Sequence, residues 1–247
     1  MVERHDRAAL ATFCVEGPLV AGEIVRLGED AAHHARVRRL APGEGVRLTN
    51  GAGTRASAEL TAVNKSALAA RVLEAESVPR PAAIHLRVPI ADRDRMLWLA
   101  EKSTELGIAS WQAVRFRRSA SVSPRGEGSP FVARVRARMI GALEQSGGGW
   151  MPAILPDAEP STLELPRAAI GLVLDRTGAP LLPALAGESG EVAIVLGPEG
   201  GMEPDELELL VARGWRSVRL AATTLRFETA AIAAVAIARA TTVTEDS

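Results

Sequence analysis

The sequence predicts an α/β protein with two domains, a small β-barrel followed by a domain built on a mainly parallel sheet. Two observations lead to this fold class. The first 76 residues or so consist of short β-type segments separated by turns rich in glycine and asparagine. Beyond residue 81, apolar strand-like runs alternate with helical segments, which is typical of βαβ units. The 247 residues are enough for two modest hydrophobic cores.

The composition is that of an ordinary globular protein, with 47% hydrophobic and 24% charged residues. No apolar run reaches the roughly 18 residues of a membrane helix. Residues 1–22 lack the order of basic, apolar and small residues that marks a signal peptide. The single cysteine, Cys14, excludes an internal disulfide and agrees with a reducing compartment. We therefore expect a cytoplasmic protein that has no membrane partner.

The formal net charge of −1 conceals a segregation of sign along the chain. Residues 81–140 contain 11 Lys and Arg against 5 Asp and Glu, whereas residues 141–247 contain 7 against 15. Basic side chains in the middle of the chain could neutralise RNA phosphates. These are Arg115, Arg117, Arg118, Arg125, Arg134, Arg136 and Arg138. For the last three, a solvated helix face is an equally good interpretation.

In the first domain, one basic helix interrupts the β-type pattern. Strands are expected over residues 23–27, 45–49, 55–63 and 67–74. The helix begins near Asp30 and carries His33, His34, Arg36, Arg38 and Arg39. Adjacent histidines point about 100° apart on a helix, which makes His33 and His34 poor joint ligands. We expect no metal site.

Two prolines, at positions 79 and 81, mark the domain boundary because proline disfavours both helices and central strands. We expect the first domain to cover residues 1–76 and the second residues 77–247. Strands are predicted over residues 84–90, 111–116, 170–175, 192–196 and 217–221, and helices over 92–106 and after Ser129, Pro204 and Ala230. The glycines at 147–149 and the prolines from 152 to 166 predict a long connection.

Two neighbouring strand ends in the second domain carry loops suited to a ligand. The apolar run 192–196 ends at Gly197-Pro198-Glu199-Gly200-Gly201, and the run 217–221 leads into residues 223–230. In open parallel sheets, ligands bind at the carboxyl ends of the strands. The loop matches neither the dinucleotide nor the Walker fingerprint, and acids in the following helix would repel a phosphate. We expect a weakly charged ligand held by backbone groups; a purely structural turn is the alternative.

The second loop places Arg226 and Glu228 at a loop-to-helix junction. Glu228 or Thr229 could cap the helix, and Arg226 could face the ligand cleft. Cys14 lies in the β-rich region, far along the chain from these loops, so we expect it to be a spectator rather than a nucleophile. Hydrolytic triads and zinc sites find no support in the motifs.

The two loop motifs together resemble the RsmE family of 16S ribosomal RNA uridine methyltransferases, which belong to the SPOUT class. The resemblance rests on Leu196–Gly201, the acidic helix after it, and Leu225–Ala230. Weaker similarities are His33 with Arg36 and Arg39, Gly43-Glu44-Gly45, Asn50-Gly51, Lys102 with Glu105-Leu106-Gly107, and Glu144-Gln145-Ser146. Nearly the whole chain is covered. One departure is Gly148, at a position where the family usually carries an arginine.

The resemblance implies a PUA-like β-barrel that helps to hold RNA, followed by a SPOUT-type trefoil-knotted parallel-sheet domain that binds S-adenosylmethionine and forms a homodimer. The implied partner is 16S rRNA or the assembled small ribosomal subunit, with no metal. The cofactor would lie among the segments 174–178, 196–201 and 220–226. The residues that match are Leu174, Leu196, Gly197, Pro198, Glu199, Gly200, Gly201, Leu220, Thr224, Leu225 and Arg226.

Methyl transfer to uridine N3 is an in-line displacement that also requires loss of the N3 proton. We expect Arg226 to hold the RNA or to stabilise negative charge on the uracil, and Glu199 and Glu228 to organise the pocket. The candidate RNA-binding residues are Arg36, Arg39, Lys102, Arg118 and Arg125. Open alternatives are another SPOUT methyltransferase that modifies a ribose 2′-hydroxyl or another base, and a non-catalytic RNA-binding factor. An oxidoreductase is disfavoured by the missing glycine fingerprint.

Overall fold

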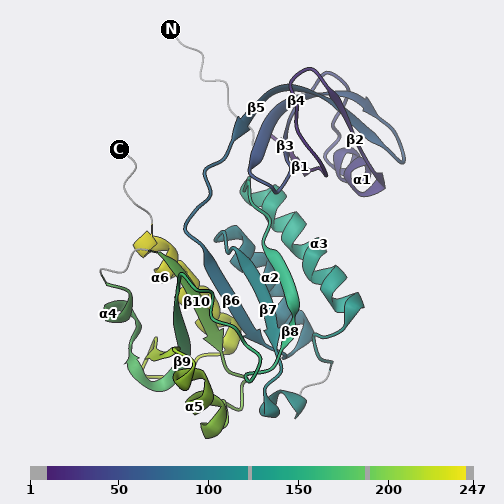
Figure 1. Ribbon diagram of the computed structural model, residues 1–247. Helices are drawn as coiled ribbons and strands as arrows, with labels where there is room; N and C mark the ends of the chain where they lie inside the picture. The colour runs from purple at the N-terminus through teal and green to yellow at the C-terminus, as the bar shows by residue number, and fades with distance from the viewer. Residues whose placement is uncertain (1–9, 122–123, 187–189, 243–247) are drawn as a thin grey trace. The chain divides into compact units, whose positions relative to one another are not determined.

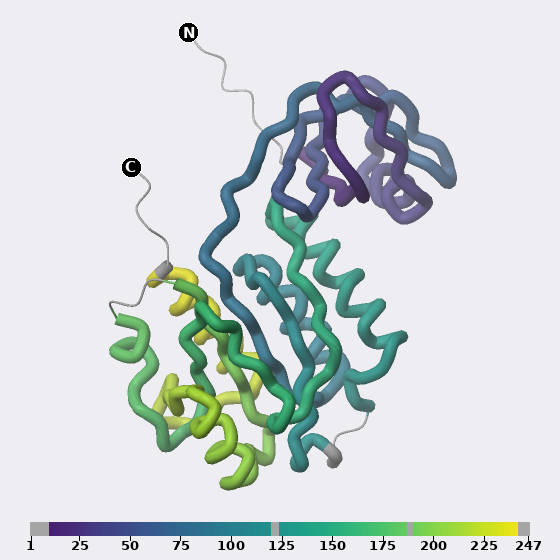
Figure 2. Tube along the Cα trace, in the orientation of Figure 1, coloured from purple at the N-terminus to yellow at the C-terminus, as the bar shows by residue number. Residues whose placement is uncertain are grey.

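The computed structural model describes residues 10–121, 124–186 and 190–242, which form two compact units (Figure 1). The first unit comprises the chain up to Arg80 together with Leu143–Met151. The second comprises Pro81–Ala142 and the chain from Pro152 onward. Figure 2 shows that chain segments distant in sequence are interleaved within the second unit.

The first unit is a curled five-stranded sheet with one helix, as the β-type pattern predicts (Figure 1). The elements are β1 (Thr12–Cys14), β2 (Ile24–Leu27), α1 (Glu29–Val37), β3 (Gly45–Thr49), β4 (Thr54–Val63) and β5 (Leu68–Ser77). The strand order is β1-β3-β4-β5-β2, antiparallel except for the parallel pair of β1 and β3. Alternate side chains of the strands point inward, and Phe13, Leu48 and Leu60 are fully buried there.

The glycine-rich segment 147–149, which the sequence predicts to be part of a long connection, belongs to the first unit. The Thr49 hydroxyl donates a 2.9 Å hydrogen bond to the carbonyl oxygen of Gly148. The Gly53 N–H donates to the carbonyl of Gly149 at 2.8 Å. A Cβ on Gly53 would lie 2.3 Å from the Trp150 ring, so only glycine permits this close approach. The connection is therefore packed against the β3–β4 turn.

The second unit contains a six-stranded, all-parallel sheet, which confirms the predicted α/β class. The strands are β6 (Ile84–Pro89), β7 (Ser110–Val114), β8 (Ala153–Ala158), β9 (Ala169–Pro180), β10 (Glu191–Leu196) and β11 (Arg216–Arg219). Their order is β11-β9-β10-β6-β7-β8. β8 is not expected from the sequence because Pro156 interrupts the apolar pattern; the strand tolerates this proline because it lies at the edge of the sheet.

Helices cover both faces of this sheet, which explains the continuous apolar run of β10. They are α2 (Arg93–Glu105), η1 (Arg117–Ser121), α3 (Ser129–Ser146), α4 (Leu181–Leu185), α5 (Pro204–Ala212) and α6 (Phe227–Thr242). On one face α6 packs on β6 and β10 and contacts α2. On the other, Leu210 of α5 and Trp215 pack against Ala193 and Val195. The strand order does not by itself trace a knot, so the trefoil knot stays a prediction.

No helix of the described residues combines the length and apolar character needed to cross a membrane.

Candidate active site

A cavity of about 390 Å³ lies at the carboxyl ends of β10 and β11 and beside the middle of β9, which is adjacent to both strands. Its walls come from the three segments that the resemblance implies. Among the predicted cofactor residues, those that line it are Leu174, Leu196, Gly197, Pro198, Glu199, Gly200, Gly201, Leu220, Thr224 and Leu225. Arg226 is not among the lining residues, although Phe227 and Ala230 beside it are. Arg176 and Thr177 also line it and lie in the expected segment 174–178, whereas Met202 and Arg219 lie outside the expected segments.

The first wall is a bulge in β9. β11 pairs with β9 at Val173, and after a register shift it pairs again at Ala179, so the residues between them project from the ladder. A Cβ on Gly178 would lie 2.4 Å from the Val218 backbone nitrogen, so the two backbones touch there. Arg176 Nη1 donates a 3.1 Å hydrogen bond to the Thr224 hydroxyl, which ties this wall to the third segment.

The second wall is the glycine loop between β10 and α5. The Gly201 N–H donates to the Pro198 carbonyl at 2.8 Å, and Gly201 has a φ of +77°, which a residue with a side chain rarely adopts. This loop exposes main-chain groups to the cavity because neither Gly197 nor Gly200 has a side chain to cover them. It presents backbone donors and acceptors within a partly apolar wall.

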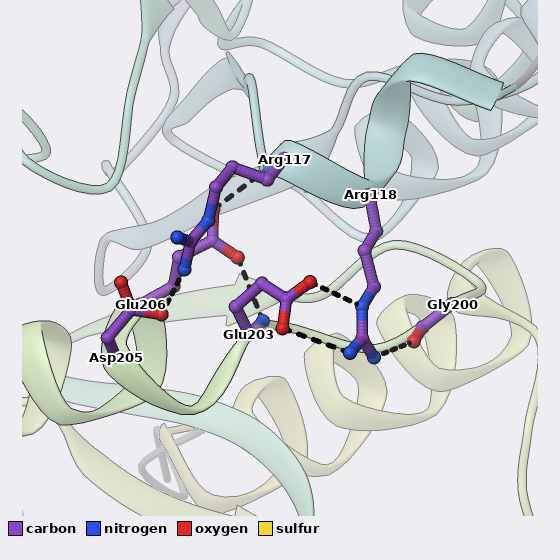
Figure 3. A network of polar contacts seen from close by, with 6 residues as sticks. All are labelled: Arg117, Arg118, Gly200, Glu203, Asp205 and Glu206. Carbon is purple, nitrogen blue, oxygen red and sulfur yellow. Dashed lines mark hydrogen bonds and ion pairs between the residues drawn. The ribbon is translucent and has the colours of Figure 1, made fainter.

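The acids at the start of α5 all have partners from η1 or the loop. The buried Glu206 carboxylate accepts the backbone N–H groups of Glu203 and Arg117, each at 2.9 Å. Arg117 Nη2 donates to Asp205, and this hydrogen bond lowers the pKa of the Asp205 carboxyl. Figure 3 shows both acids turned toward the arginine. These acids therefore stabilise the start of α5, and their negative charge is unfavourable for binding a phosphate there.

Arg118 reaches the glycine loop directly (Figure 3). Its Nε and Nη2 donate to the two carboxylate oxygens of Glu203 at 2.9 and 3.0 Å, and its Nη1 donates to the Gly200 carbonyl at 2.6 Å. From the sequence, this side chain is expected to bind RNA. In the structure its guanidinium is engaged with the loop that lines the cavity.

A group of four charged side chains lies beside the cavity. Arg95 of α2 donates from Nη1 to Glu199, and its Nε lies 3.9 Å from Glu228 Oε1. Arg226 Nη1 lies 3.9 Å from Glu199 Oε1. Glu228 is only 14% exposed, and its Oε2 is buried without a hydrogen-bond partner among the described residues. The structure thus brings the three predicted catalytic residues together and adds Arg95.

The predicted RNA-binding residues occupy different environments. In the first unit, Arg36 and Arg39 of the α1 region are exposed, and Arg39 has a φ of 58°, a conformation uncommon outside glycine. In the second unit, Lys102 Nζ contacts Glu105 at 2.7 Å and Glu101 at 2.9 Å, and these hydrogen bonds raise its pKa. Arg125 Nε lies 2.9 Å from Glu127 Oε1. The α1 arginines are the most open to an anionic partner.

Known families account for both units. A family described as an RNA methyltransferase domain matches residues 78–239, and one described as an RNA methyltransferase PUA domain matches residues 27–73. The ribosomal RNA small subunit methyltransferase E of Mycobacterium bovis is 31% identical to this chain over 223 residues, which cover 84% of this chain and 82% of the relative. The chain belongs to the family of ribosomal RNA small subunit methyltransferase E, the RsmE family. The namesake from Rickettsia conorii is 27% identical and covers 91% of this chain and 93% of its own.

Solved structures of the RsmE family extend the likeness. The enzyme from Neisseria gonorrhoeae bound to S-adenosylmethionine has a TM-score of 0.84 and 29% identity, covering 92% of this chain and 95% of its own. A putative methyltransferase from Legionella pneumophila with the same bound cofactor has a TM-score of 0.84 and 25% identity, covering 94% and 97%. The resemblance to the RsmE family drawn from the two loop motifs is confirmed, as is a PUA-like first unit.

Arg95 is the main site residue of this RsmE family member that sequence reasoning missed. It lies one turn into α2, after Asp92, whose carboxylate accepts the Arg95 N–H at 3.0 Å and caps the helix. A cation so close to a helix start is disfavoured by the helix dipole. That local conflict is the only signal in the sequence, and it does not reveal the partners Glu199 and Glu228.

Proposed function

We propose that this protein transfers the methyl group of S-adenosylmethionine to N3 of one uridine in the 16S rRNA of the small ribosomal subunit, at the position conventionally numbered 1498. The observation that carries the proposal is the cavity beside β9 and at the ends of β10 and β11, which both sequence motifs line in a chain of the RsmE family. The RsmE-family neighbour from Neisseria gonorrhoeae holds S-adenosylmethionine.

The residues present fit this cofactor. A cavity of about 390 Å³ is within the usual range of roughly 300–1,000 Å³ for small-ligand sites. Apolar side chains and the main-chain groups of the glycine loop suit an adenosine. The apolar side chains are Leu174, Leu196, Leu220 and Leu225.

When bound, S-adenosylmethionine supplies an electrophilic methyl group, so the protein needs to align the acceptor and assist loss of its proton. The Arg226 side chain is 61% exposed and stands beside the cavity, where its guanidinium can hold the RNA or stabilise negative charge on the uracil. Glu199 and Glu228 orient the two arginines next to them. The proposal includes no metal because the sulfonium already activates the methyl group.

RNA binding is assigned to the exposed Arg36 and Arg39 and to the half-buried Lys102 and Arg125. Each phosphate that they neutralise steepens the salt dependence of RNA binding.

We also propose that α6 contributes to a homodimer, because Ile232, Ala236 and Ile237 leave an apolar stripe partly exposed on this helix. A 16S rRNA substrate, free or assembled in the small subunit, supports our inference of a cytoplasmic protein.

Two measurements test the proposal. Calorimetry with S-adenosylmethionine should give a saturable heat of binding; absence of binding would favour a non-catalytic RNA-binding factor. Mass spectrometry of 16S rRNA nucleosides from cells lacking the protein should show loss of 3-methyluridine, restored by complementation. Loss of a 2′-O-methyl nucleoside or of another methylated base would instead identify a different SPOUT-class reaction.

A further inference from the structure

Arg118 forms three hydrogen bonds, and all of them end on the loop and helix start that bound the proposed donor cavity. Two go in parallel to the Glu203 carboxylate, at 2.9 and 3.0 Å, and the third goes to the Gly200 carbonyl at 2.6 Å. Figure 3 shows the guanidinium lying between these two groups. A paired guanidinium and carboxylate is the most directional charged contact that side chains make. The paired hydrogen bonds to Glu203 hold the Arg118 guanidinium in place, and its third hydrogen bond then restrains the Gly200 carbonyl of the loop.

The loop needs such a support because two consecutive glycines form its tip. Glycine loses more backbone freedom on ordering than any other residue, so the Gly200-Gly201 turn costs more to hold in one conformation. A Cβ on Gly200 would lie 3.3 Å from Arg118 Cδ, which means that the aliphatic part of Arg118 already covers this glycine. The side chain therefore restrains the turn by packing as well as by hydrogen bonding.

The same segment is anchored a second time by its backbone. The N–H of Arg117 donates to Glu206, and the other oxygen of Glu206 accepts the N–H of Glu203. Glu203 is the residue that receives the Arg118 fork. Consequently η1 and the start of α5 form one connected hydrogen-bond network that ends at Gly200, as Figure 3 shows.

We propose that Arg118 is a positioning residue for the methyl-donor loop, and that this role, rather than contact with RNA phosphates, is its contribution to the reaction. The inference rests on the proposed function. A ligand whose binding-competent state is only partly populated has its apparent dissociation constant raised by the inverse of that fraction. Arg118 keeps the loop in the competent state, so its removal weakens donor binding without touching the transfer chemistry.

The test compares donor binding by calorimetry in wild type, Arg118→Ala and Arg118→Lys. We expect Arg118→Ala to raise the Kd for S-adenosylmethionine about tenfold or more, where tenfold corresponds to about 1.4 kcal/mol. Lysine provides one point charge in place of the fork, so it should recover only part of the loss. In steady-state methylation, KM for the donor should rise while kcat at saturating donor stays near the wild-type value. A residue that merely stabilised the fold would not give this split.

Two further variants make the comparison specific. Arg115→Ala removes a neighbouring basic side chain whose Nη1 pairs with Glu127 at 2.9 Å and which does not line the donor cavity, so its donor Kd should equal that of wild type. Glu203→Gln removes the charge that receives the fork. The double variant Arg118→Ala/Glu203→Gln should be weaker by less than the product of the two single effects, because both break one interaction.

The outcomes separate the possibilities. Unchanged donor affinity in Arg118→Ala overturns the proposal, and so does a selective loss of RNA affinity with normal donor binding, which would make Arg118 an RNA contact. If Arg118→Ala fails to fold, Arg118→Lys provides the test. Wild-type donor affinity in Arg118→Lys would show that the paired hydrogen bonds to Glu203 are not needed, and would also overturn the proposal. Failure of the wild-type protein to bind S-adenosylmethionine would instead refute the proposed function.

Discussion

Arg95 Nη1 donates a hydrogen bond to Glu199 in the glycine loop, and the Nε of the same guanidinium lies 3.9 Å from the Glu228 carboxylate at the start of α6. One arginine of α2 thus neutralises two carboxylates that belong to different walls of the site. Arg226 is left with a single, longer approach to Glu199 and is 61% exposed. We therefore propose different tasks for the two arginines: Arg95 holds the site together, and Arg226 contacts the substrate.

We predict that Arg95→Ala lowers kcat/KM for RNA methylation by about ten- to a hundredfold, since loss of a partly buried charged hydrogen bond typically costs about 1.5–3 kcal/mol. Without Arg95, Glu199 and Glu228 would repel each other, and Arg226 would be drawn toward the unpaired acids. Transfer of labelled methyl groups to small ribosomal subunits measures this effect. Arg93→Ala is the matched control, because Arg93 lies in the same helix and its side chain pairs at 3.4 Å with exposed Asp94. An equal loss in both variants would contradict the assignment.

Arg226→Ala should abolish methylation while leaving the fold and the donor affinity intact. The guanidinium does not line the cavity, so the donor loses no contact, but the cation that faces the RNA is gone. We expect kcat to fall by at least about a hundredfold, the size found when a group that stabilises transition-state charge is removed. Single-turnover methylation measures the step, and circular dichroism checks the fold. Exposed Arg213, at the end of α5, provides the control substitution; normal turnover in Arg226→Ala would remove this residue from the mechanism.

Gly178→Ala and Gly141→Ala should have opposite effects on stability. A Cβ on Gly178 would meet the β11 backbone at 2.4 Å, and backbone cannot move aside as a flexible side chain can, so we expect a loss of about 1–3 kcal/mol and weaker donor binding. A Cβ on Gly141, inside α3, would meet nothing within 4 Å and should gain about 0.5–1 kcal/mol. Urea unfolding measures both changes. Equal behaviour of the two variants would contradict the close contact of β9 with β11.

The parts of the site that the sequence predicts are those determined by local chemistry. The run Val192–Leu196 is apolar at every position because β10 is buried on both faces, and its abrupt end at Gly197 marks the carboxyl edge of the sheet. Parallel strands bring such ends together without further information. This is why two separated motifs predict one cavity, whereas Leu174 and Leu220 are assigned to it only through the family resemblance.

The remaining features depend on contacts that no local pattern encodes. The three-residue strand β1 exists only because it pairs with β3, and the bulge in β9 appears only when β11 lies beside it. In the sequence, Arg118 is indistinguishable from the other cations of a basic segment, because its partners Glu203 and Gly200 are more than 80 positions away. A Cβ on Gly148 would lie 2.8 Å from Leu143 Cδ1, so a larger residue at this position would require the leucine side chain to move. These strand pairings and hydrogen bonds join residues that are distant in sequence, so only the folded structure reveals them.

Glu144, at the end of α3, should make the stability of the first unit depend on pH. Its Oε1 accepts the Cys14 N–H at 2.8 Å, and its Oε2 lies 4.0 Å from His34 Nδ1. Burial raises the pKa of the Glu144 carboxyl above its ordinary value of 4.5, although the Cys14 N–H and the nearby Arg38 act in the opposite direction. Burial, Arg38 and His33 lower the pKa of His34, so the imidazole is mostly neutral near pH 7 and adds little compensating charge.

The sign of the effect follows from proton counting. Between 4.5 and the higher folded pKa, the native state binds more protons than the unfolded state, so the free energy of unfolding falls as pH rises through this window. One proton limits the slope to about 1.4 kcal/mol per pH unit. Glu144→Gln keeps an oxygen for the Cys14 N–H but does not titrate. Its stability relative to wild type should therefore rise with pH and then level off, as measured by urea unfolding at several pH values, with exposed Glu16→Gln as control. A difference that stays constant with pH would show that Glu144 is not held in a desolvated site.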